Sequence, residues 1–463
     1  MKSTENVFDF FSNETDFPDL DVSGAARRLS AAIQCRTVSD CPDPAPFEQL
    51  HKLIRDSYPS LMQAGSMEVL DRSVLITVPG SDLFLRPALF MSHLDVVPVV
   101  AGTEQNWTHD AFSGAIADGY IWGRGTLDIK NQVFGVLEAA EYLLSRGDRP
   151  RRGFYLAFGQ DEETFNTGAL AIAELLRSRG VTLEFLLDEG GGKISSGDSY
   201  GAPGIFVSTI DLMEKGYADL ELSVRSEGGH SSRPFGGTSL GILSEAIAAI
   251  TQNPFPAELS PVMEAAFRAL GPHITAEPLR SLLADPEANR SAIAQCCLQQ
   301  PTLFPHVTTT IAPTVIRGSS AACNVMPQDM EAVINFRIAA GHTPEEVLVR
   351  CRELVQDQRV SLRFLQANPP SAIARTDGTG YAALHEVLMH YFQDLVFVPF
   401  ATAGATDAHQ YESICDTCLR FSPFMAPESE SNSGVHGTNE RISVRAYAHG
   451  IRVLIALMYR SCL

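Results

Sequence analysis

The chain has 463 residues, of which 45% are hydrophobic and 19% are charged, and its formal net charge at pH 7 is −20. This length exceeds what one hydrophobic core usually supports, so two domains are expected. An acidic surface disfavours nucleic acid as a partner, because nucleic acid is bound chiefly by Lys and Arg side chains that neutralise phosphates. We therefore expect a well-packed globular protein that does not bind nucleic acid.

From the given sequence we expect neither an export signal nor a membrane-spanning segment. Its N-terminus lacks an apolar segment of the kind that directs secretion, and no stretch is long enough to span a bilayer. Nine cysteines, an odd number scattered over a long chain, fit reduced thiols better than a disulfide framework. Cys415 and Cys418 form a single C-x-x-C motif beside an expected strand, where a structural role is favoured over a redox or zinc role. These features predict a cytoplasmic protein without a membrane partner.

The first stretch that suggests chemistry is an apolar run, residues 88–91, followed by His93 and Asp95. The run predicts a buried strand, and polar side chains two residues apart at its end point the same way. Most His-x-Asp pairs are ordinary strand ends, so the motif alone is weak. The alternative is a metal-binding imidazole that the neighbouring carboxylate orients.

A glycine-rich loop comes next in the chain. Three glycines within residues 119–125 indicate backbone that turns tightly. The spacing is not that of a nucleotide-binding loop, and no phosphate-binding Lys-Ser/Thr follows. Apolar residues at helical spacing predict a helix over 130–144, which places Asp128 just before its N-terminus. Asp128 is therefore either a helix N-cap or, together with other motifs, a metal ligand.

Two further expected strands end in carboxylates. Residues 153–158 predict a strand followed by the acidic run 161–163, and residues 183–187 predict one followed by the acids 188–189. Like charges about 4 Å apart repel by about 4 kcal/mol at an effective dielectric of about 20, and solvent or bound cations would relieve that cost. Open α/β sheets place ligands at the carboxyl ends of their strands. The sequence thus predicts an α/β domain with a cation site at that edge.

From residue 214 the pattern changes to the order β-α-β-β-α-β, which is the ferredoxin-like arrangement. The expected elements are strands at 217–224, 307–317, 330–338 and 360–365, with helices at 239–250 and 343–356. We therefore predict an inserted α+β domain over residues 214–367, between the two parts of the first domain, 1–213 and 368–463.

The candidate ligands are two histidines and three acids: His93, Asp128, Glu163, Asp188 and His436. Such a set, with one shared carboxylate, suits two zinc ions that keep open positions for water. Five motifs, in order, resemble the M20 family of metallopeptidases: His93-Leu94-Asp95, Gly123-Arg124-Gly125-Thr126-Leu127-Asp128, Asp161-Glu162-Glu163, Gly228-Gly229-His230-Ser231-Ser232 and Val435-His436-Gly437. The segments Arg420-Phe421-Ser422-Pro423 and His436-Gly437-Thr438-Asn439-Glu440-Arg441 are similar to its carboxypeptidase S and N-acyl-amino-acid hydrolase branch.

The resemblance implies a zinc-exopeptidase-type α/β catalytic domain with an inserted ferredoxin-like α+β lid domain. It implies that Asp128 bridges two zinc ions, with His93 and Asp188 completing the protein ligands of one, and Glu163 and His436 those of the other. Co²⁺ and Mn²⁺ are alternatives to Zn²⁺. It also leaves open a homodimer formed through the lid domain.

Further roles are implied in the same way. Asp95 would orient the histidine two residues before it, and Glu162 would be the general base that deprotonates the metal-bridging water. His230 would steady the oxyanion, and Asn324 and Arg337 would hold the substrate carboxylate. Without the resemblance, the favoured interpretation is a surface strand charge for Arg337 and an ordinary loop histidine for His230.

The resulting prediction is a two-zinc hydrolase that cleaves an amide or peptide bond next to a free α-carboxylate, in a small peptide or an N-acyl amino acid. One alternative is a deacylase of a biosynthetic intermediate on the same fold, and another is a catalytically inactive binding relative. The intact base and ligand set argue against inactivity. One departure concerns the substrate loop, where His409 stands at a position that is more often Lys or Arg in the family.

Overall fold

The computed structural model describes residues 11–318, 322–392, 394–425 and 434–463, and the chain forms two compact units. Unit 1 comprises Met1–Met213, Ala372–Phe400 and Thr406–Leu463, and unit 2 comprises Glu214–Ser371 and Ala401–Ala405. The first division falls where the sequence places the start of the inserted domain. The second falls four residues later than predicted, and a short segment near residue 403 also belongs to unit 2.

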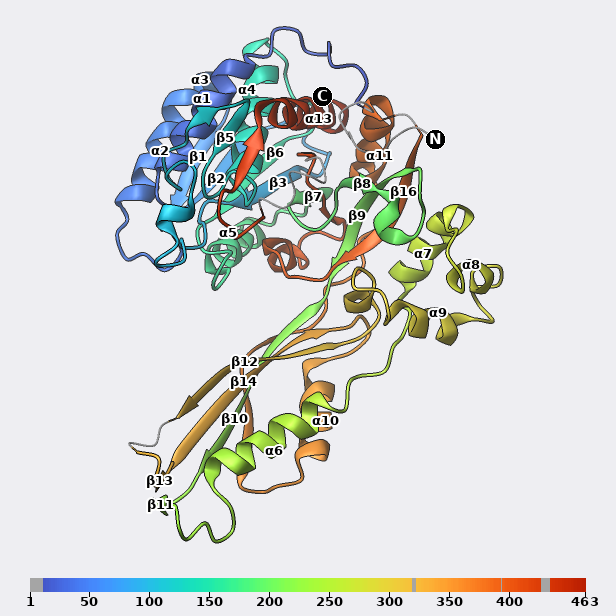
Figure 1. Cartoon of the computed structure of the whole chain (residues 1–463). Helices are drawn as coiled ribbons and strands as arrows, with labels where there is room; N and C mark the ends of the chain where they lie inside the picture. Colours follow the sequence, from blue (N-terminus) through green and yellow to red (C-terminus); the bar gives the residue numbers. More distant parts are fainter. Residues whose placement is uncertain (1–10, 319–321, 393, 426–433) are drawn as a thin grey trace. The chain divides into compact units, whose positions relative to one another are not determined.

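A mixed β-sheet forms the centre of unit 1 (Figure 1). Among the described residues its strand order is β1-β2-β6-β3-β7-β17-β9-β16, and β8 pairs with β9. The strands are β1 Ser66–Leu70, β2 Ser73–Val78, β3 Ala88–His93, β6 Phe154–Gly159, β7 Phe185–Asp188, β8 Ile194–Ser196, β9 Phe206–Glu214, β16 Leu395–Thr402 and β17 Cys418–Arg420. Strand β3 is parallel to β6 and β7, and β7 is parallel to β17. The carboxyl ends of these four strands therefore lie at one edge of the sheet.

Helices cover both faces of this sheet because the strand side chains alternate between two apolar cores. In β3, Phe90 belongs to one core, whereas Leu89 and Met91 belong to the other. The first core also takes side chains from α1 Val22–Gln34, α2 Ala45–Ser57, α3 Pro59–Ala64, α4 Lys130–Ser145, α11 Thr379–Tyr391 and α13 Val444–Cys462. The second core takes them from α5 Thr167–Ser178 and η6 Asp407–Tyr411. The predicted α/β class is confirmed.

A small antiparallel sheet of β4 Ile116–Ala117, β5 Tyr120–Trp122 and β18 Arg441–Ser443 lies in the same unit. Its order is β18-β5-β4, with Arg441 opposite Trp122. Strand β5 leads into the glycine-rich loop, and β18 follows the loop that carries His436. The sheet therefore joins two loops that are more than three hundred residues apart in sequence.

Unit 2 is built on an antiparallel sheet of order β12-β14-β10-β15. Its elements are β10 Gly216–Arg225, α6 Ser239–Thr251, β12 Thr310–Gly318, β14 Asp329–Ile338, α10 Pro344–Val355 and β15 Val360–Asn368. Both helices pack on one face of the sheet. Helix α10 begins with the expected capping box, in which Thr343 accepts from the Glu346 N–H and Glu346 accepts from the Thr343 N–H. The predicted ferredoxin-like arrangement is confirmed.

Two additions complete unit 2. The strands β11 Gly229–His230 and β13 Val325–Met326 pair with each other, and α7 Pro261–Leu270, α8 Leu279–Leu282 and α9 Arg290–Cys297 lie between α6 and β12. Across the described parts of both units, we find no helix that combines the length and the apolar character needed to cross a bilayer. The nine cysteines are free thiols. The predicted cytoplasmic location stays a prediction.

Candidate metal centre

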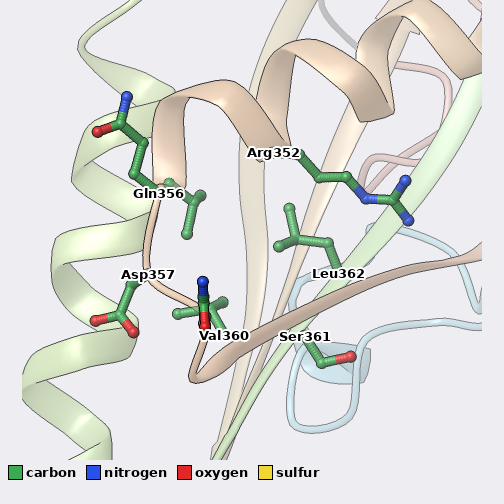
Figure 2. A pocket seen from close by; sticks show the side chains of 8 residues that line it. Arg352, Gln356, Asp357, Val360, Ser361 and Leu362 are labelled. Carbon is green, nitrogen blue, oxygen red and sulfur yellow. The ribbon is translucent and has the colours of Figure 1, made fainter.

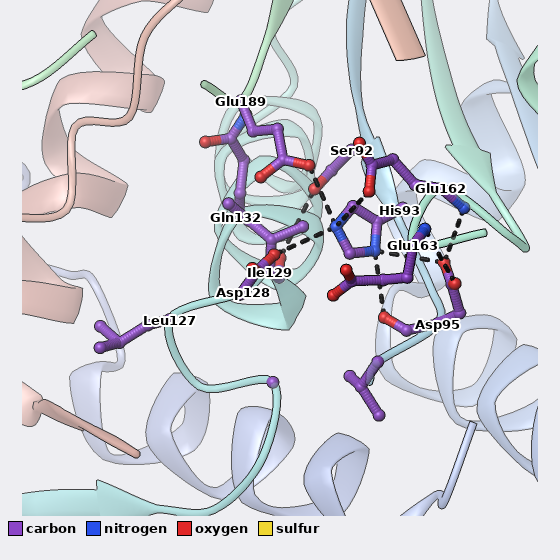
Figure 3. Close-up of polar contacts among 12 residues, drawn as sticks. Ser92, His93, Asp95, Leu127, Asp128, Ile129, Gln132, Glu162, Glu163 and Glu189 are labelled. Carbon is purple, nitrogen blue, oxygen red and sulfur yellow. Dashed lines mark hydrogen bonds and ion pairs between the residues drawn. The ribbon is translucent and has the colours of Figure 1, made fainter. Parts of the chain in front are cut away.

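Acidic side chains lie around His93 at the carboxyl ends of β3, β6 and β7 in unit 1 (Figure 3). A second histidine, His436, lies beside two of these acids. His93 is the last residue of β3, Glu162 and Glu163 lie in the loop after β6, and Glu189 follows β7. The parallel pairing of these strands brings their ends together, as their sequence patterns predict.

The first potential ligand group comprises His93, Asp128 and Glu189. The Nε2 atom of His93 lies 3.2 Å from Asp128 Oδ1 and 3.0 Å from Glu189 Oε1. His93 is buried, whereas both carboxylates are partly accessible. One imidazole and two carboxylates form a donor set that suits Zn²⁺ and related divalent ions.

The second potential ligand group comprises Asp128, Glu163 and His436. His436 Nε2 lies 3.0 Å from Asp128 Oδ2 and 3.1 Å from Glu163 Oε2. Asp128 thus directs one oxygen to each group, as a carboxylate bridging two cations would. It is not the N-cap of α4, because the N-cap residue there is Ile129 and no side chain caps that helix. The ligand interpretation of Asp128 is therefore favoured over the capping one.

The structure differs from the sequence prediction at the end of β7. Within the described residues Glu189, and not Asp188, is grouped with His93, so the ligand role of Asp188 stays a prediction. The Asp188 carboxylate instead accepts from the backbone N–H groups of Ala408, at 2.9 Å, and of Glu189, at 2.8 Å. Asp188 is the last residue of β7, whereas Glu189 lies just beyond the strand, with its carboxylate beside His93. The pattern of two acids in a row was the only signal in the sequence for Glu189.

The cluster contains more acidic groups than positively charged groups, and this imbalance shifts the pKa values of its members. Burial raises the pKa of Glu189 to about 7. Burial, reinforced by the charges of neighbouring acids, also raises the pKa of Glu162 well above its usual value. Hydrogen bonds to Asp128 and Glu163 raise the pKa of His436 to about 10. Bound cations would remove this repulsion, so the residues present fit a pair of divalent metal ions.

Asp95 is completely buried and holds several parts of the centre at once. Its Oδ1 lies 3.2 Å from His93 Nδ1, which leaves Nε2 of the ring facing the ligand groups. The same carboxylate accepts from the backbone N–H groups of Glu162, at 3.1 Å, and of Glu163, at 3.3 Å. Asp95 therefore orients both a candidate ligand and the loop that carries the candidate base.

Glu162 lies beside the ligands, yet it belongs to neither group among the described residues. Its Oε2 is 3.9 Å from His93 Nε2, whereas the next residue, Glu163, contacts His436 directly. The two adjacent glutamates therefore face different partners. A partly buried carboxylate that is near the ligands but is not one of them is suited to proton transfer.

The remaining predicted site residues lie in unit 2. His230 is exposed, and its Nδ1 accepts from the Ser232 N–H at 3.1 Å, so the ring proton is on Nε2. His230 pairs across β11 and β13 with Val325, the neighbour of Asn324. Arg337 lies on β14, with its guanidinium 4.7 Å from the ring centre of Tyr217. Asn324 and His230 are thus close along the β11–β13 ladder, and Arg337 lies on the main sheet of the unit.

A hollow of about 390 Å³ in unit 2 is a second place where a small molecule could lie (Figure 2). The end of α10 and the start of β15 line it, through Arg352, Val355, Gln356, Asp357, Gln358, Val360, Ser361 and Leu362. No predicted site residue is among them, and they form no cluster of catalytic or metal-binding groups. The acidic cluster of unit 1 is therefore the candidate functional site.

Comparisons with known proteins agree with this geometry. Residues 89–460 match the family described as Peptidase family M20/M25/M40. The human N-fatty-acyl-amino acid synthase/hydrolase PM20D1 is 34% identical over 442 residues, which cover 93% of this chain and 86% of that protein. A carboxypeptidase S-like protein of Dictyostelium discoideum is 30% identical over 456 residues, or 95% and 85% of the two chains. The M20 family metallo-carboxypeptidase Sso-CP2 from Sulfolobus solfataricus has a similar fold, with a TM-score of 0.65 at 16% identity over 94% of this chain and 99% of that one.

Proposed function

Since this chain belongs to peptidase family M20/M25/M40, we propose that it is a two-metal hydrolase that cleaves an amide or peptide bond next to a free α-carboxylate. The observation that carries the proposal is the shared position of Asp128. One of its oxygens faces His93 and Glu189, and the other faces Glu163 and His436. Zn²⁺ is the metal that this donor set suits best, with Co²⁺ and Mn²⁺ as alternatives.

Different residues of the chain have different roles in the reaction. Two divalent cations held by these groups would polarise the scissile carbonyl and acidify a water molecule. Glu162 accepts the proton of the attacking water and returns it to the leaving nitrogen, because its carboxylate is close to the ligand groups and free of them. Asp95 keeps the backbone of Glu162 in place. The family resemblance implies that His230, whose Nδ1 accepts from the Ser232 N–H, would donate a hydrogen bond from Nε2 to the oxyanion.

The substrate class follows from what the relatives' names have in common. N-acyl amino acids and the substrates of carboxypeptidases both carry a free carboxylate beside the amide that is cleaved. Arg337 would bind this carboxylate through the planar fork of its guanidinium, with Asn324 as a second donor. Stacking on Tyr217 limits the orientations of the Arg337 side chain, so its fork is preorganised.

The test is a substrate panel combined with metal removal. Purified protein should contain two divalent ions per chain and should hydrolyse N-acyl amino acids or dipeptides far faster than their C-terminal amides. Treatment with a chelator should abolish turnover, and added Zn²⁺, Co²⁺ or Mn²⁺ should restore it. Turnover that survives complete metal removal, or equal rates on acids and amides, would contradict the proposal. The same panel distinguishes N-acyl amino acids from dipeptides.

A further inference from the structure

The second ligand group depends on two loops that belong to no large sheet or helix. One is the glycine-rich loop that ends in Asp128, and the other carries His436. His436 has a φ of 64°, in the left-handed region, and half of its side chain is exposed. Even so, its Nε2 lies 3.0 Å from Asp128 Oδ2. Loops are usually more mobile than the elements they connect, so residues that link the two loops would help to hold this separation.

The carboxylate of Glu440 is completely buried and organises the first of these loops. Its Oε1 accepts from three backbone N–H groups, those of Gly125 at 3.0 Å, Leu127 at 2.8 Å and Asp128 at 3.2 Å. Three donors on one oxygen curl the loop around the carboxylate. This fixes the direction in which the Asp128 side chain leaves the backbone.

Arg124 connects this arrangement to the second loop. Its guanidinium is 2% exposed and donates through Nη1 to Glu440 Oε2 at 2.6 Å and through Nη2 to the backbone carbonyl of His436 at 3.1 Å. The ring of Trp107 lies against it, with 5.6 Å between the guanidinium carbon and the ring centre. One planar side chain thus contacts Glu440 and the backbone of His436 at once.

Stability alone is a poor explanation for this pair. Burying two charges costs free energy that their attraction often only offsets, and apolar residues of similar volume can be equally stable or more stable. A planar guanidinium that donates to a carboxylate and to one particular backbone carbonyl has a different effect. It fixes the positions of these two groups relative to each other. The two linked loops are also the ones that carry Asp128 and His436.

We propose that Arg124 and Glu440 are positioning residues that set the separation of Asp128 and His436, and with it the cation affinity of the second ligand group. The inference rests on the proposed metal centre. The first group depends on the pair less, since Asp95 fixes His93, and Glu189 follows strand β7 directly. Loss of the link should therefore weaken one cation site more than the other.

Arg124→Lys is the main test, because it keeps the charge beside Glu440 but lacks the fork that also contacts His436. Metal-stripped protein would be titrated with Zn²⁺ by calorimetry and with Co²⁺ by visible absorption. We expect two binding events in the wild type. In the variant we expect one of them to weaken by about 10- to 100-fold, as is usual when a partner of a metal ligand is lost, and the other to change by less than about threefold. Unchanged affinities, or equal weakening of both, would overturn the inference.

A matched control separates positioning from general stability. Arg28 and Glu138 form another ion pair in unit 1, with Nε to Oε1 at 2.5 Å and Nη2 to Oε2 at 2.7 Å, and neither residue lies on a ligand loop. Arg28→Lys should lower the melting temperature without changing either metal affinity. Glu440→Gln is the second variant, and its circular dichroism verifies folding before titration. A wild type that binds no metal contradicts the proposed function itself, whereas a wild type with two sites that Arg124→Lys leaves unchanged contradicts the positioning role alone.

Discussion

The acidic cluster of unit 1 and the polar residues on the sheet of unit 2 differ in their balance of charge. In unit 1, the acids around Asp128 outnumber the two histidines that face them. On the sheet of unit 2, polar groups pair with one another both within a strand and across neighbouring strands. Asp219 accepts from Asn335 at 2.9 Å and from the Tyr217 hydroxyl at 2.7 Å, and Arg337 stands opposite Tyr217 in the register.

The difference teaches what each region can do. The cluster of unit 1 has unbalanced negative charge in a buried setting, which cations would neutralise, so it is suited to metal-dependent chemistry. In the network of unit 2, Asp219 accepts from two neighbours, and the guanidinium of Arg337 stacks on the ring of Tyr217. That arrangement is suited to recognising an anionic group. Substitutions in unit 1 should therefore change metal content and turnover, and those in unit 2 should change substrate preference with metal content preserved.

The largest effect is expected from Asp128→Ala, because this carboxylate belongs to both ligand groups. Both metals should be lost, activity should disappear, and the melting temperature should fall, since the remaining acids repel one another. Elemental analysis and thermal unfolding measure the two effects together. The exposed Glu174→Ala serves as a control for loss of a carboxylate in the same unit. Tight binding of two ions by Asp128→Ala would show that it is no bridging ligand.

The next largest effect is expected from substitutions of the adjacent residues Glu162 and Glu163, which should have different consequences. Glu162→Gln should lower kcat by about 10²- to 10⁴-fold, the usual contribution of a general base, while metal content stays at the wild-type level. Glu163→Gln should reduce metal content, because Glu163 contacts His436 in the second ligand group. Kinetics and metal analysis of both variants give the comparison. Near-normal turnover by Glu162→Gln would show that another group takes the proton.

A third prediction concerns the metal-free protein, in which the charge imbalance of unit 1 should make stability depend on pH. Burial raises the pKa of Glu189 from 4.5 to about 7, and hydrogen bonds to Asp128 and Glu163 raise that of His436 from 6.5 to about 10. Both groups therefore hold protons in the folded state that they lose in the unfolded chain. Linkage then requires the free energy of unfolding to fall as pH rises, through Glu189 between pH 4.5 and 7 and through His436 between pH 6.5 and 10.

Denaturant unfolding in the presence of a chelator, at several pH values across this window, measures the effect. The pKa of Asp128 is lowered, so it contributes with the opposite sign, but only around and below its ordinary value of 3.8. His436→Asn should remove the upper part of the dependence and leave the lower part. Saturating Zn²⁺ should reverse the trend, since metal binding competes with protons. Metal-free stability that rises from pH 6 to pH 9 would contradict the charge imbalance.

The sequence predicted well those features that depend on local pattern. An apolar run followed at once by His93 and Asp95 defines both the strand and the chemistry at its end, so β3 and its polar residues could be foreseen. The order of elements in unit 2 was equally readable, because β10 shows alternating burial along much of its length and Thr343 caps the second helix. The resemblance of the ordered motifs to the M20 family also predicted that residues distant in the chain lie close together.

Other features could not be read because they depend on contacts between distant segments. Asp188 accepts from the Ala408 amide, which lies more than two hundred residues away, and such a contact cannot be foreseen from the local pattern of two adjacent acids. The roles of Arg124 and Glu440 arise from a salt bridge across 316 positions. The inclusion of residues 401–405 in unit 2 likewise reflects tertiary contacts rather than composition.

The smallest effect is expected in unit 2, where Arg337→Lys keeps the charge but loses the planar fork over Tyr217. If Arg337 binds the substrate carboxylate, kcat/KM should fall by about tenfold, because a hydrogen bond to a charged group contributes about 1.5–3 kcal/mol. Metal content should not change.

Arg337→Ala should also reduce the ratio of kcat/KM for an N-acyl amino acid to that for its C-terminal amide, since both substrates then lack the partner. Tyr217→Leu, which removes the ring but not the guanidinium, should have the smaller effect of the same sign. An unchanged acid-to-amide ratio in Arg337→Ala would assign the carboxylate to another residue, and His409 on η6, at the position that is more often Lys or Arg in the family, would be the next to replace.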